Sequence, residues 1–440
     1  MKLSEHLDKG FWALADRGLP FVYAVAQIVV ARVLGLEEYG TYVVFQVIFN
    51  MLFAFTDNFA LQAIVKYGVE PGINVEALIS STTSLFLGFL LPILLLFNLF
   101  PHLISDVLGN THLAQLFPLL ALYVIVSAPR VIYSKVLQMR FRMRDIFFVD
   151  LANFGLGGLL LAIGLAQHVI QHADQVIWRT VIAAIVSSAV AVWFGSRHVG
   201  LRFEYSRPMF TRIRDFVRYQ GATGLVSVLQ QNIDTLAVSS FTGALGAGAY
   251  GGAKNVYRLF DVMRDTVTLL VFPATSKYYS RNETETVRTI IEKAVGFLYL
   301  ILIPLSILLF VLAPVFYHLV FGPKFDSSIP IFRILVVGSL VLPIQMVFIS
   351  TMVGMGRVKE MFRIISTGLT LNVIVTLVLL PTIGIAGAAI SFVIGNAIQA
   401  FLAFKIIKKK IGFNARELPR LAFSDASNFI RATLKSRKAH

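Results

Sequence analysis

Five charged residues lie within one apolar stretch that has the length of a membrane-spanning helix, residues 249–273: Lys254, Arg258, Asp261, Arg264 and Asp265. A helix turns by about 100° per residue, so all of them except Arg264 fall on a stripe about 60° wide. Arginine binds phosphate through paired hydrogen bonds, and lysine binds it as a compact charge. The stripe predicts a cationic, water-filled cavity for an anionic group. A salt-bridge ladder that joins two helices is the alternative interpretation.

A milder polar stripe lies on the apolar stretch 40–64, where Gln46, Asn50 and Asp57 share a face at helical spacing. We expect these three to be polar residues of the same cavity. Arg17, in the first apolar stretch, either lines the cavity or extends to the membrane surface.

Other polar residues in apolar stretches suggest ion coupling. Asp234 shares a helix face with Gln231, and Asn372 and Thr376 lie one turn apart in a later stretch. Acids within membranes often bind protons or sodium, and amide and hydroxyl oxygens can complete a hard-cation site. We therefore consider possible Na⁺ or H⁺ coupling. A polar cluster that holds helices together is the alternative, and no cofactor and no other metal is expected.

Three further charged residues have expected roles at helix ends. Arg130 and Arg333 are each expected to be a gate or an interfacial anchor, and Asp150 an interfacial or capping residue.

The composition defines the class of protein. The chain is 57% hydrophobic and only 14% charged, whereas soluble domains are about 25% charged. Its mean hydropathy is +0.75. Alternating segments typical of a β-barrel are absent from the sequence, and the lack of cysteine excludes disulfides and thiolate metal sites. The sequence predicts an all-α polytopic membrane protein.

The apolar stretches predict about 12 transmembrane helices. They lie near 11–34, 40–64, 77–104, 113–136, 146–167, 175–195, 215–241, 249–273, 290–320, 328–353, 361–382 and 384–406. Alternate loops are basic, including Lys135 and Arg140 after the fourth span and Arg207 and Arg212 after the sixth. The positive-inside rule then places both termini in the cytoplasm. This topology explains the net charge of +15, so we expect no nucleic-acid partner.

The chain also repeats itself. The positions of several glycines, tyrosines and prolines recur in a second copy. Leu34-Gly35 and Tyr39-Gly40 match Leu245-Gly246 and Tyr250-Gly251, and Pro92, Pro101 and Pro129 match Pro304, Pro314 and Pro343. The separation within these pairs grows slowly along the chain, as it would between two copies with small insertions. We predict two six-helix lobes related by a pseudo-two-fold axis, 1–205 and 206–408, followed by a basic cytoplasmic tail, 409–440.

Two segments carry a resemblance to a known family. The segments ARVLGLEEYGTY and QNIDTLAVSSFTGALGAGAYGGAKNVYR resemble the Wzx-type oligosaccharide flippases of the MOP superfamily, and the likeness extends over roughly 10–410. The resemblance implies a MOP/MATE-like fold and alternating access. It also implies movement of an undecaprenyl-diphosphate-linked oligosaccharide, such as an O-antigen or exopolysaccharide repeat unit of lipopolysaccharide biosynthesis, across the bacterial inner membrane.

The resemblance also implies roles for individual residues. Arg17, Lys254 and Arg258 match positions of cavity arginines in related flippases, and Asp234 and Asn372 match a sodium site of a similar relative. This chain has no second acid near Asn372, which is a departure from that site. The partners implied are the polyprenyl-linked glycan, the lipid bilayer and, as possible partners, a polysaccharide polymerase and a chain-length regulator.

Two other functions remain open at this point. A MATE-like exporter of small organic molecules shares the twelve-span plan, but organic cations favour an acidic cavity. A membrane polysaccharide polymerase or ligase usually has a large external loop with catalytic residues, and every external loop predicted here is short. A transporter is therefore expected rather than an enzyme.

Overall fold

A computed structural model describes residues 3–199 and 206–414, and within these ranges the chain is helical without strands. Contacts between residues divide it into two compact units. The first runs to Ala249 and includes Val320–Lys324, and the second comprises Tyr250–Leu319 and the chain from Phe325 onward. The prediction of an all-helical protein is confirmed.

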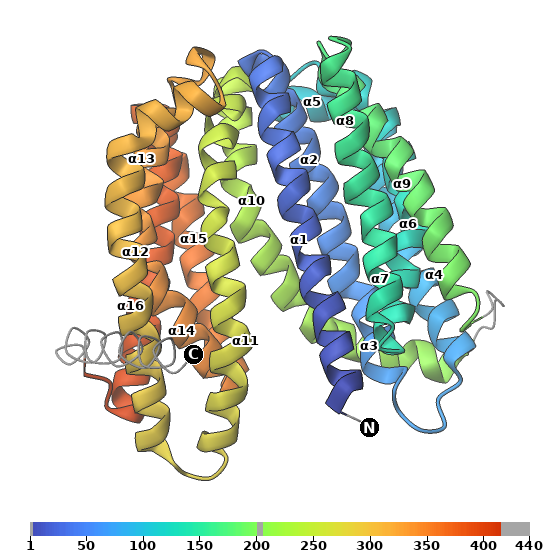
Figure 1. Cartoon of the computed structure of the whole chain (residues 1–440), viewed down its shortest axis with the longest axis vertical. Coiled ribbons are helices and arrows are strands. Elements are labelled where there is room, and N and C mark those ends of the chain that lie inside the picture. The colour runs from blue at the N-terminus through green and yellow to red at the C-terminus, as the bar shows by residue number, and fades with distance from the viewer. Residues whose placement is uncertain (1–2, 200–205, 415–440) are drawn as a thin grey trace, which may run out of the picture. The chain divides into compact units, whose positions relative to one another are not determined.

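The first unit contains the helices from α1 to most of α10 (Figure 1). They are α1 (Leu3–Val33), α2 (Leu36–Thr56), η1 (Asp57–Leu61), α3 (Gln62–Tyr67), α4 (Val75–Leu99), α5 (Pro101–Val107), α6 (Leu113–Met139), α7 (Met143–Asp150), η2 (Leu151–Gly155), α8 (Leu156–Ala166), α9 (Ala173–Gly195) and most of α10 (Arg207–Tyr257). Helix α6 packs on α9 and contacts α2, α3 and α7, so its side chains reach several other spans.

Two of the spans in this unit contain a π-helical turn. The turn η1 continues α2 into α3, and η2 joins α7 to α8. Such turns insert an extra residue into a helix and are frequent at functional sites. Here η1 begins at Asp57, and η2 directly follows Asp150.

The second unit contains the end of α10 and the remaining helices. They are α11 (Leu259–Tyr279), α12 (Thr284–Val320), the short η3 (Pro323–Phe325), α13 (Ser328–Ser339), α14 (Leu342–Gly354), α15 (Val358–Ile383) and α16 (Ile385–Ile411). Helix α16 packs against α13, α14 and α15. Helices α13 and α14 are bent by 50° at a break just before Pro343, which lies in the first turn of α14.

The predicted spans coincide with these helices, although their number is only partly confirmed. Among the described residues, eight helices are long and apolar enough to cross a membrane, and the bent pair of α13 and α14 would make a ninth. The predicted spans at 11–34, 215–241 and 249–273 fall on α1, α10 and α11, which do not meet that criterion. Charged residues lower the hydropathy of the last two, as the opening stripe already showed.

Close backbone contact explains two glycines, Gly40 of the repeated motif in α2 and Gly248 of α10. A β-carbon built on Gly40 would lie 1.8 Å from the carbonyl oxygen of Ala244, and one on Gly248 would lie 2.0 Å from that of Leu36. Only glycine fits at either position, so α2 and α10 approach backbone to backbone. Helix α10 also turns sharply at Gly243, whose φ of 72° is readily adopted by glycine.

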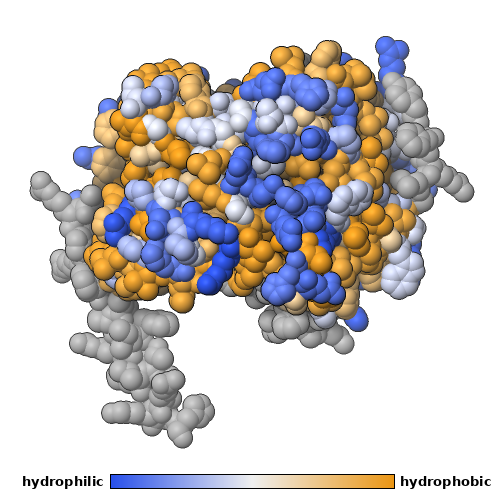
Figure 2. All heavy atoms as spheres, turned by 90° about the horizontal axis from the view of Figure 1, so that it is seen from above, coloured by the Kyte–Doolittle hydropathy of each residue, from blue (hydrophilic) through white to orange (hydrophobic). Residues whose placement is uncertain are grey.

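The helix sides are apolar and exposed. Leu95 of α4 is 59% exposed and Val311 of α12 is 62% exposed. Viewed onto one end of the molecule, hydrophilic residues gather over the helix ends and apolar residues over the helix sides (Figure 2). These are the surfaces expected of helices whose sides contact lipid and whose ends contact water.

The compact units do not divide where the predicted lobes do. The contact boundary lies at Ala249 and Tyr250, whereas the internal repeat places the boundary near 205. The first part of α10 belongs to the first unit because Ser239 and the glycines described above pack on it; Ser239 Oγ donates to the carbonyl of Leu108 at 2.6 Å. Lobes at 1–205 and 206–408, and their symmetry, remain predictions. The tail from 415 lies outside the described residues.

Candidate substrate-binding site

Asp57, at the start of the π-helical turn in the second span, forms an ion pair within the first unit. Its Oδ1 lies 2.9 Å from Nζ of Lys135 on α6, and Gln62 Nε2 donates to Oδ2 at 2.7 Å. The side chains of Asp57 and Lys135 are 23% and 17% exposed, so the pair is largely shielded. The polar character predicted for Asp57 is thus matched by a basic partner.

The position of Lys135 corrects the sequence analysis. Lys135 was expected in a basic loop after the fourth span, but α6 continues to Met139 and holds it within the helix. The apolar run ends near 136, and a long lysine stem packs readily among apolar side chains while its charge meets a carboxylate. A largely shielded lysine in this helix is one candidate site residue that the sequence reasoning missed.

A second ion pair joins the same helix to the fifth span. Arg130 Nη1 of α6 lies 3.0 Å from Asp150 Oδ1 at the end of α7, and both side chains are 20% exposed. Asp150 was expected to cap a helix or lie at the interface; it lies at the end of α7 and also pairs with an arginine of a neighbouring span, a contact that the sequence did not indicate.

This arrangement has one chemical consequence. An ion pair within a span is neutral overall, and it can open when an anionic ligand replaces the carboxylate on the basic side chain. Helix α6 supplies the basic member of both pairs, and each acid adjoins a π-helical turn.

The other predicted residues of α2 differ from each other. Gln46 Nε2 donates to the hydroxyl of Tyr42 at 2.8 Å, so this amide is held in place. Asn50 is exposed. Both are placed on α2 as predicted, and their contact with a ligand remains a prediction.

In the second unit two of the three predicted basic residues can be described, and their surroundings differ. Lys254 is only 7% exposed, and its Nζ lies 5.7 Å from the ring centre of Tyr250 and 5.4 Å from that of Phe392. Arg258 is exposed and lies between α10 and α11, where its backbone stays helical and its N–H donates to the carbonyl of Lys254 at 3.0 Å. The two cations, one turn apart, therefore differ in burial.

Some predicted residues cannot be placed. The side chains of Arg17, Asp261, Arg264 and Asp265 lie outside the described part of the structure. Their roles as cavity residues stay predictions.

The possible cation site is divided between the units. Asp234, which is fully buried in α10, belongs to the first unit and accepts a hydrogen bond from the backbone N–H of Thr235 at 2.8 Å. Asn372 and Thr376 belong to the second, where Thr376 Oγ1 donates to Asn372 Oδ1 at 3.1 Å. The pair on α15 is thus confirmed as neighbours. Among the described residues, no group of three or more histidine, aspartate or glutamate side chains could hold a metal ion.

An amide cluster in the second unit was also missed. Gln345 of α14 donates through Nε2 to Asn396 Oδ1 at 2.9 Å and to Gln399 Oε1 at 2.7 Å on α16. All three are nearly buried. Asn396 and Gln399 lie one turn apart on α16, and this spacing was the signal available in the sequence. The cluster fixes α14 against α16 through buried hydrogen bonds.

Comparison with known proteins gives a consistent family. The family described as "Polysaccharide biosynthesis protein" matches residues 29–330, more than half of the chain. The lipopolysaccharide biosynthesis protein WzxC of Escherichia coli K12 is 24% identical over 406 residues, covering 89% of this chain and 79% of its own. The probable low-salt glycan biosynthesis flippase Agl15 of Haloferax volcanii is 22% identical over 379 residues, covering 84% of this chain and 77% of its own.

Solved structures show the same fold. The lipid II flippase MurJ in an inward closed conformation superposes with a TM-score of 0.76 at 15% identity, covering 97% of this chain and 92% of its own. An inward-facing multidrug resistance MATE transporter of the MOP superfamily also gives 0.76, at 16% identity, with coverage of 91% and 98%. The MOP/MATE-like fold predicted from the sequence is confirmed.

Proposed function

Since the chain belongs to the family of polysaccharide biosynthesis proteins, we propose that it is a flippase for a polyprenyl-diphosphate-linked oligosaccharide. The relatives support this: Agl15 is named as a probable glycan flippase and MurJ as a lipid II flippase. The proposed cargo is an undecaprenyl-diphosphate-linked repeat unit, and the proposed direction is from the cytoplasmic to the outer leaflet of a bacterial inner membrane.

One observation carries the proposal, namely basic side chains held inside largely apolar helices. Arg130 and Lys135 of α6 are each about four-fifths buried or more, and Lys254 is 7% exposed. A charge facing lipid at the centre of a bilayer would cost about 2.5–3.5 kcal/mol, so such residues usually have a function. A diphosphate that must cross hydrocarbon is a ligand that would use them.

The chemistry proposed is an exchange of ion-pair partners. The diphosphate replaces the carboxylate of Asp57 on Lys135, or that of Asp150 on Arg130, and the sugars occupy water between the helices. The prenyl chain stays in lipid, so only the polar part of the cargo needs a path. Release of the cargo lets each carboxylate return to its basic partner, which resets the site for the next cycle of alternating access.

Several finer points belong to the same proposal. Both termini are proposed to lie in the cytoplasm, which the distribution of basic loops supports. A polysaccharide polymerase and a chain-length regulator are proposed partners on the outer side. Coupling to H⁺ or Na⁺ is proposed through Asp234, which is fully buried.

Export of small organic cations is less well supported. The likeness to the MATE transporter concerns the fold, and a site for organic cations needs unpaired acids. In the first unit Asp57 and Asp150 each have a basic partner. We therefore favour an anionic cargo, and a transporter rather than an enzyme.

The test is complementation of a strain that lacks its own flippase. Lys135→Gln is expected to abolish surface glycan, with the lipid-linked intermediate accumulating in the membrane. Lys277→Gln, an exposed lysine in the last turn of α11, is the matched control and should complement fully. Immunoblots of the membrane fraction confirm equal amounts of both variants. Full complementation by Lys135→Gln would contradict the role of this lysine.

A further inference from the structure

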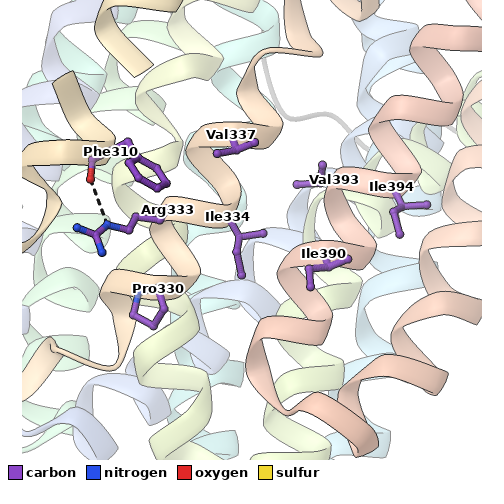
Figure 3. Close-up of a pocket in the computed structure, with 8 residues that line it drawn as sticks. All are labelled: Phe310, Pro330, Arg333, Ile334, Val337, Ile390, Val393 and Ile394. Atoms are coloured by element: carbon purple, nitrogen blue, oxygen red, sulfur yellow. Dashed lines mark hydrogen bonds between the residues drawn. The ribbon is translucent and has the colours of Figure 1, made fainter. Parts of the chain in front are cut away.

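A groove on the second unit includes Arg333 and lies apart from the proposed transport residues. It has a volume of about 470 Å³ and is formed by α12, α13 and α16. Its walls are apolar: Phe310, Pro330, Ile334, Val337, Ile390 and Val393. Figure 3 shows Ile334 and Val337 on one wall and Ile390 and Val393 on the other. One charged residue, Arg333, lies at its edge.

A proline fixes the position of this arginine. Pro314 in α12 has no N–H, so it cannot donate to the carbonyl of Phe310 one turn earlier. Arg333 Nε donates to that carbonyl oxygen at 3.1 Å, as the dashed line in Figure 3 marks. The guanidinium also lies 5.1 Å from the ring centre of Phe310. The arginine is thus held in one orientation, because its Nε satisfies an acceptor that the helix leaves open.

Because Nε is the atom that donates to this carbonyl, the two Nη groups are available for other ligands. Among the described residues, no carboxylate forms an ion pair with Arg333, unlike Arg130 of the first unit. Two Nη groups in a fixed plane match the oxygens of a phosphate. A cation at the edge of an apolar groove therefore has the chemistry of a lipid site, with a phosphate at one end and a hydrocarbon chain along the other.

The depth of Arg333 fits this occupant. It lies five residues after the start of α13 at Ser328, which is about 7.5 Å along the helix. An arginine at that depth can extend its charge to the headgroup level of the bilayer. Val337, one turn deeper, is 54% exposed, so the groove is open along its length to the acyl chains of the surrounding lipid.

We propose that this groove binds a glycerophospholipid of the surrounding bilayer, with its phosphate on Arg333 and one acyl chain between α13 and α16. The inference goes beyond the proposed transport function and does not depend on it. The site holds a lipid against the side of the second unit, where it stabilises the packing of α12, α13 and α16.

The experiment uses the full chain in nanodiscs that contain phosphatidylglycerol with a diazirine group on one acyl chain. After photolysis, we expect labelled peptides from 328–339 and 385–395. Arg333→Gln should lower this labelling about ten-fold, through loss of charge-assisted hydrogen bonds. Arg333→Lys should restore part of it, and Ile334→Trp should remove it by filling the groove while leaving the arginine in place.

Controls separate a specific site from general contact with lipid. Arg179→Gln is the matched variant, because Arg179 also donates to a backbone carbonyl, that of Gln175 at 2.6 Å, but lies in the first unit. It should leave the labelling unchanged. Equal labelling in Arg333→Gln and the parent chain would overturn the proposal. Displacement of the probe by undecaprenyl phosphate but not by excess unlabelled phosphatidylglycerol would also overturn it, and would assign the groove to the carrier lipid instead.

Discussion

Lys135 Nζ lies 2.9 Å from Oδ1 of Asp57, and this ion pair connects the fourth span to the π-helical turn of the second. Neither residue is exposed enough for water to replace its partner fully. The ion pair is central to the proposed mechanism. In that mechanism the basic side chain pairs with a carboxylate when no cargo is bound, and with the anionic cargo during transport. Its removal should therefore affect both stability and transport.

Asp57→Asn should destabilise the protein by about 1–3 kcal/mol, because Lys135 would be left in a partly buried site without its carboxylate. The double variant Asp57→Asn with Lys135→Gln should recover part of that loss. Thermal unfolding of the purified protein in detergent measures both. A double variant less stable than either single variant would argue against a pairwise interaction.

Arg130 and Asp150 should show coupled effects on stability. Each single change, Arg130→Gln or Asp150→Asn, leaves the other charge unpaired, so the two changes together should cost less than their sum by about 1–3 kcal/mol. A double-mutant cycle measured by unfolding in detergent gives this coupling. Simple additivity of the two changes would mean that the contact at 3.0 Å contributes little.

Asp234, which is fully buried in α10, should determine any dependence on protons. If this acid takes up and releases a proton in each cycle, Asp234→Asn should remove the response of transport to an imposed pH gradient. Reconstituted proteoliposomes with a fluorescent lipid-linked sugar measure the response. Asn372→Ala is the comparison, since it tests the other part of the predicted ion site. An unchanged response in Asp234→Asn would contradict a role of this acid in coupling.

Gly40→Val should prevent stable folding. Any β-carbon at this position would clash with the carbonyl oxygen of Ala244. This oxygen belongs to the backbone, so it cannot move aside as the flexible end of a side chain could. Gly88→Ala in α4 is the control, because nothing lies within 4 Å of the added atom. The amount of monodisperse protein extracted from membranes is the measurement. Normal yield and melting temperature for Gly40→Val would show that α2 and α10 separate without cost.

Most of the helices could be predicted because a membrane span can be recognised from the local composition of the sequence. Runs of about twenty apolar residues gave nearly all the helices, including the span whose two parts are bent at Pro343. The position of Gly40 in a repeated motif was also visible, although its reason, a backbone contact with α10, appeared only in three dimensions.

The ion pairs could not be predicted because they join residues far apart in sequence. Asp57 was identified as polar and Arg130 as unusual, but nothing local indicates that α6 would face both α2 and α7. The narrow stripe at 254–265 did not indicate that Lys254 is 7% exposed whereas Arg258, one turn later, is exposed. Local periodicity describes one helix at a time, whereas the site depends on contacts between helices.

The most direct test of the transport proposal removes Lys254 and Arg258, two predicted cavity cations of the second unit, together. Lys254→Ala with Arg258→Ala, expressed in a flippase-deficient strain beside Lys277→Gln, is scored by surface glycan and by the amount of protein in the membrane. The proposal predicts that the double variant is present at the parent level but restores no surface glycan, while the control restores it fully. Full restoration by the double variant would contradict the proposal that these cations bind the cargo.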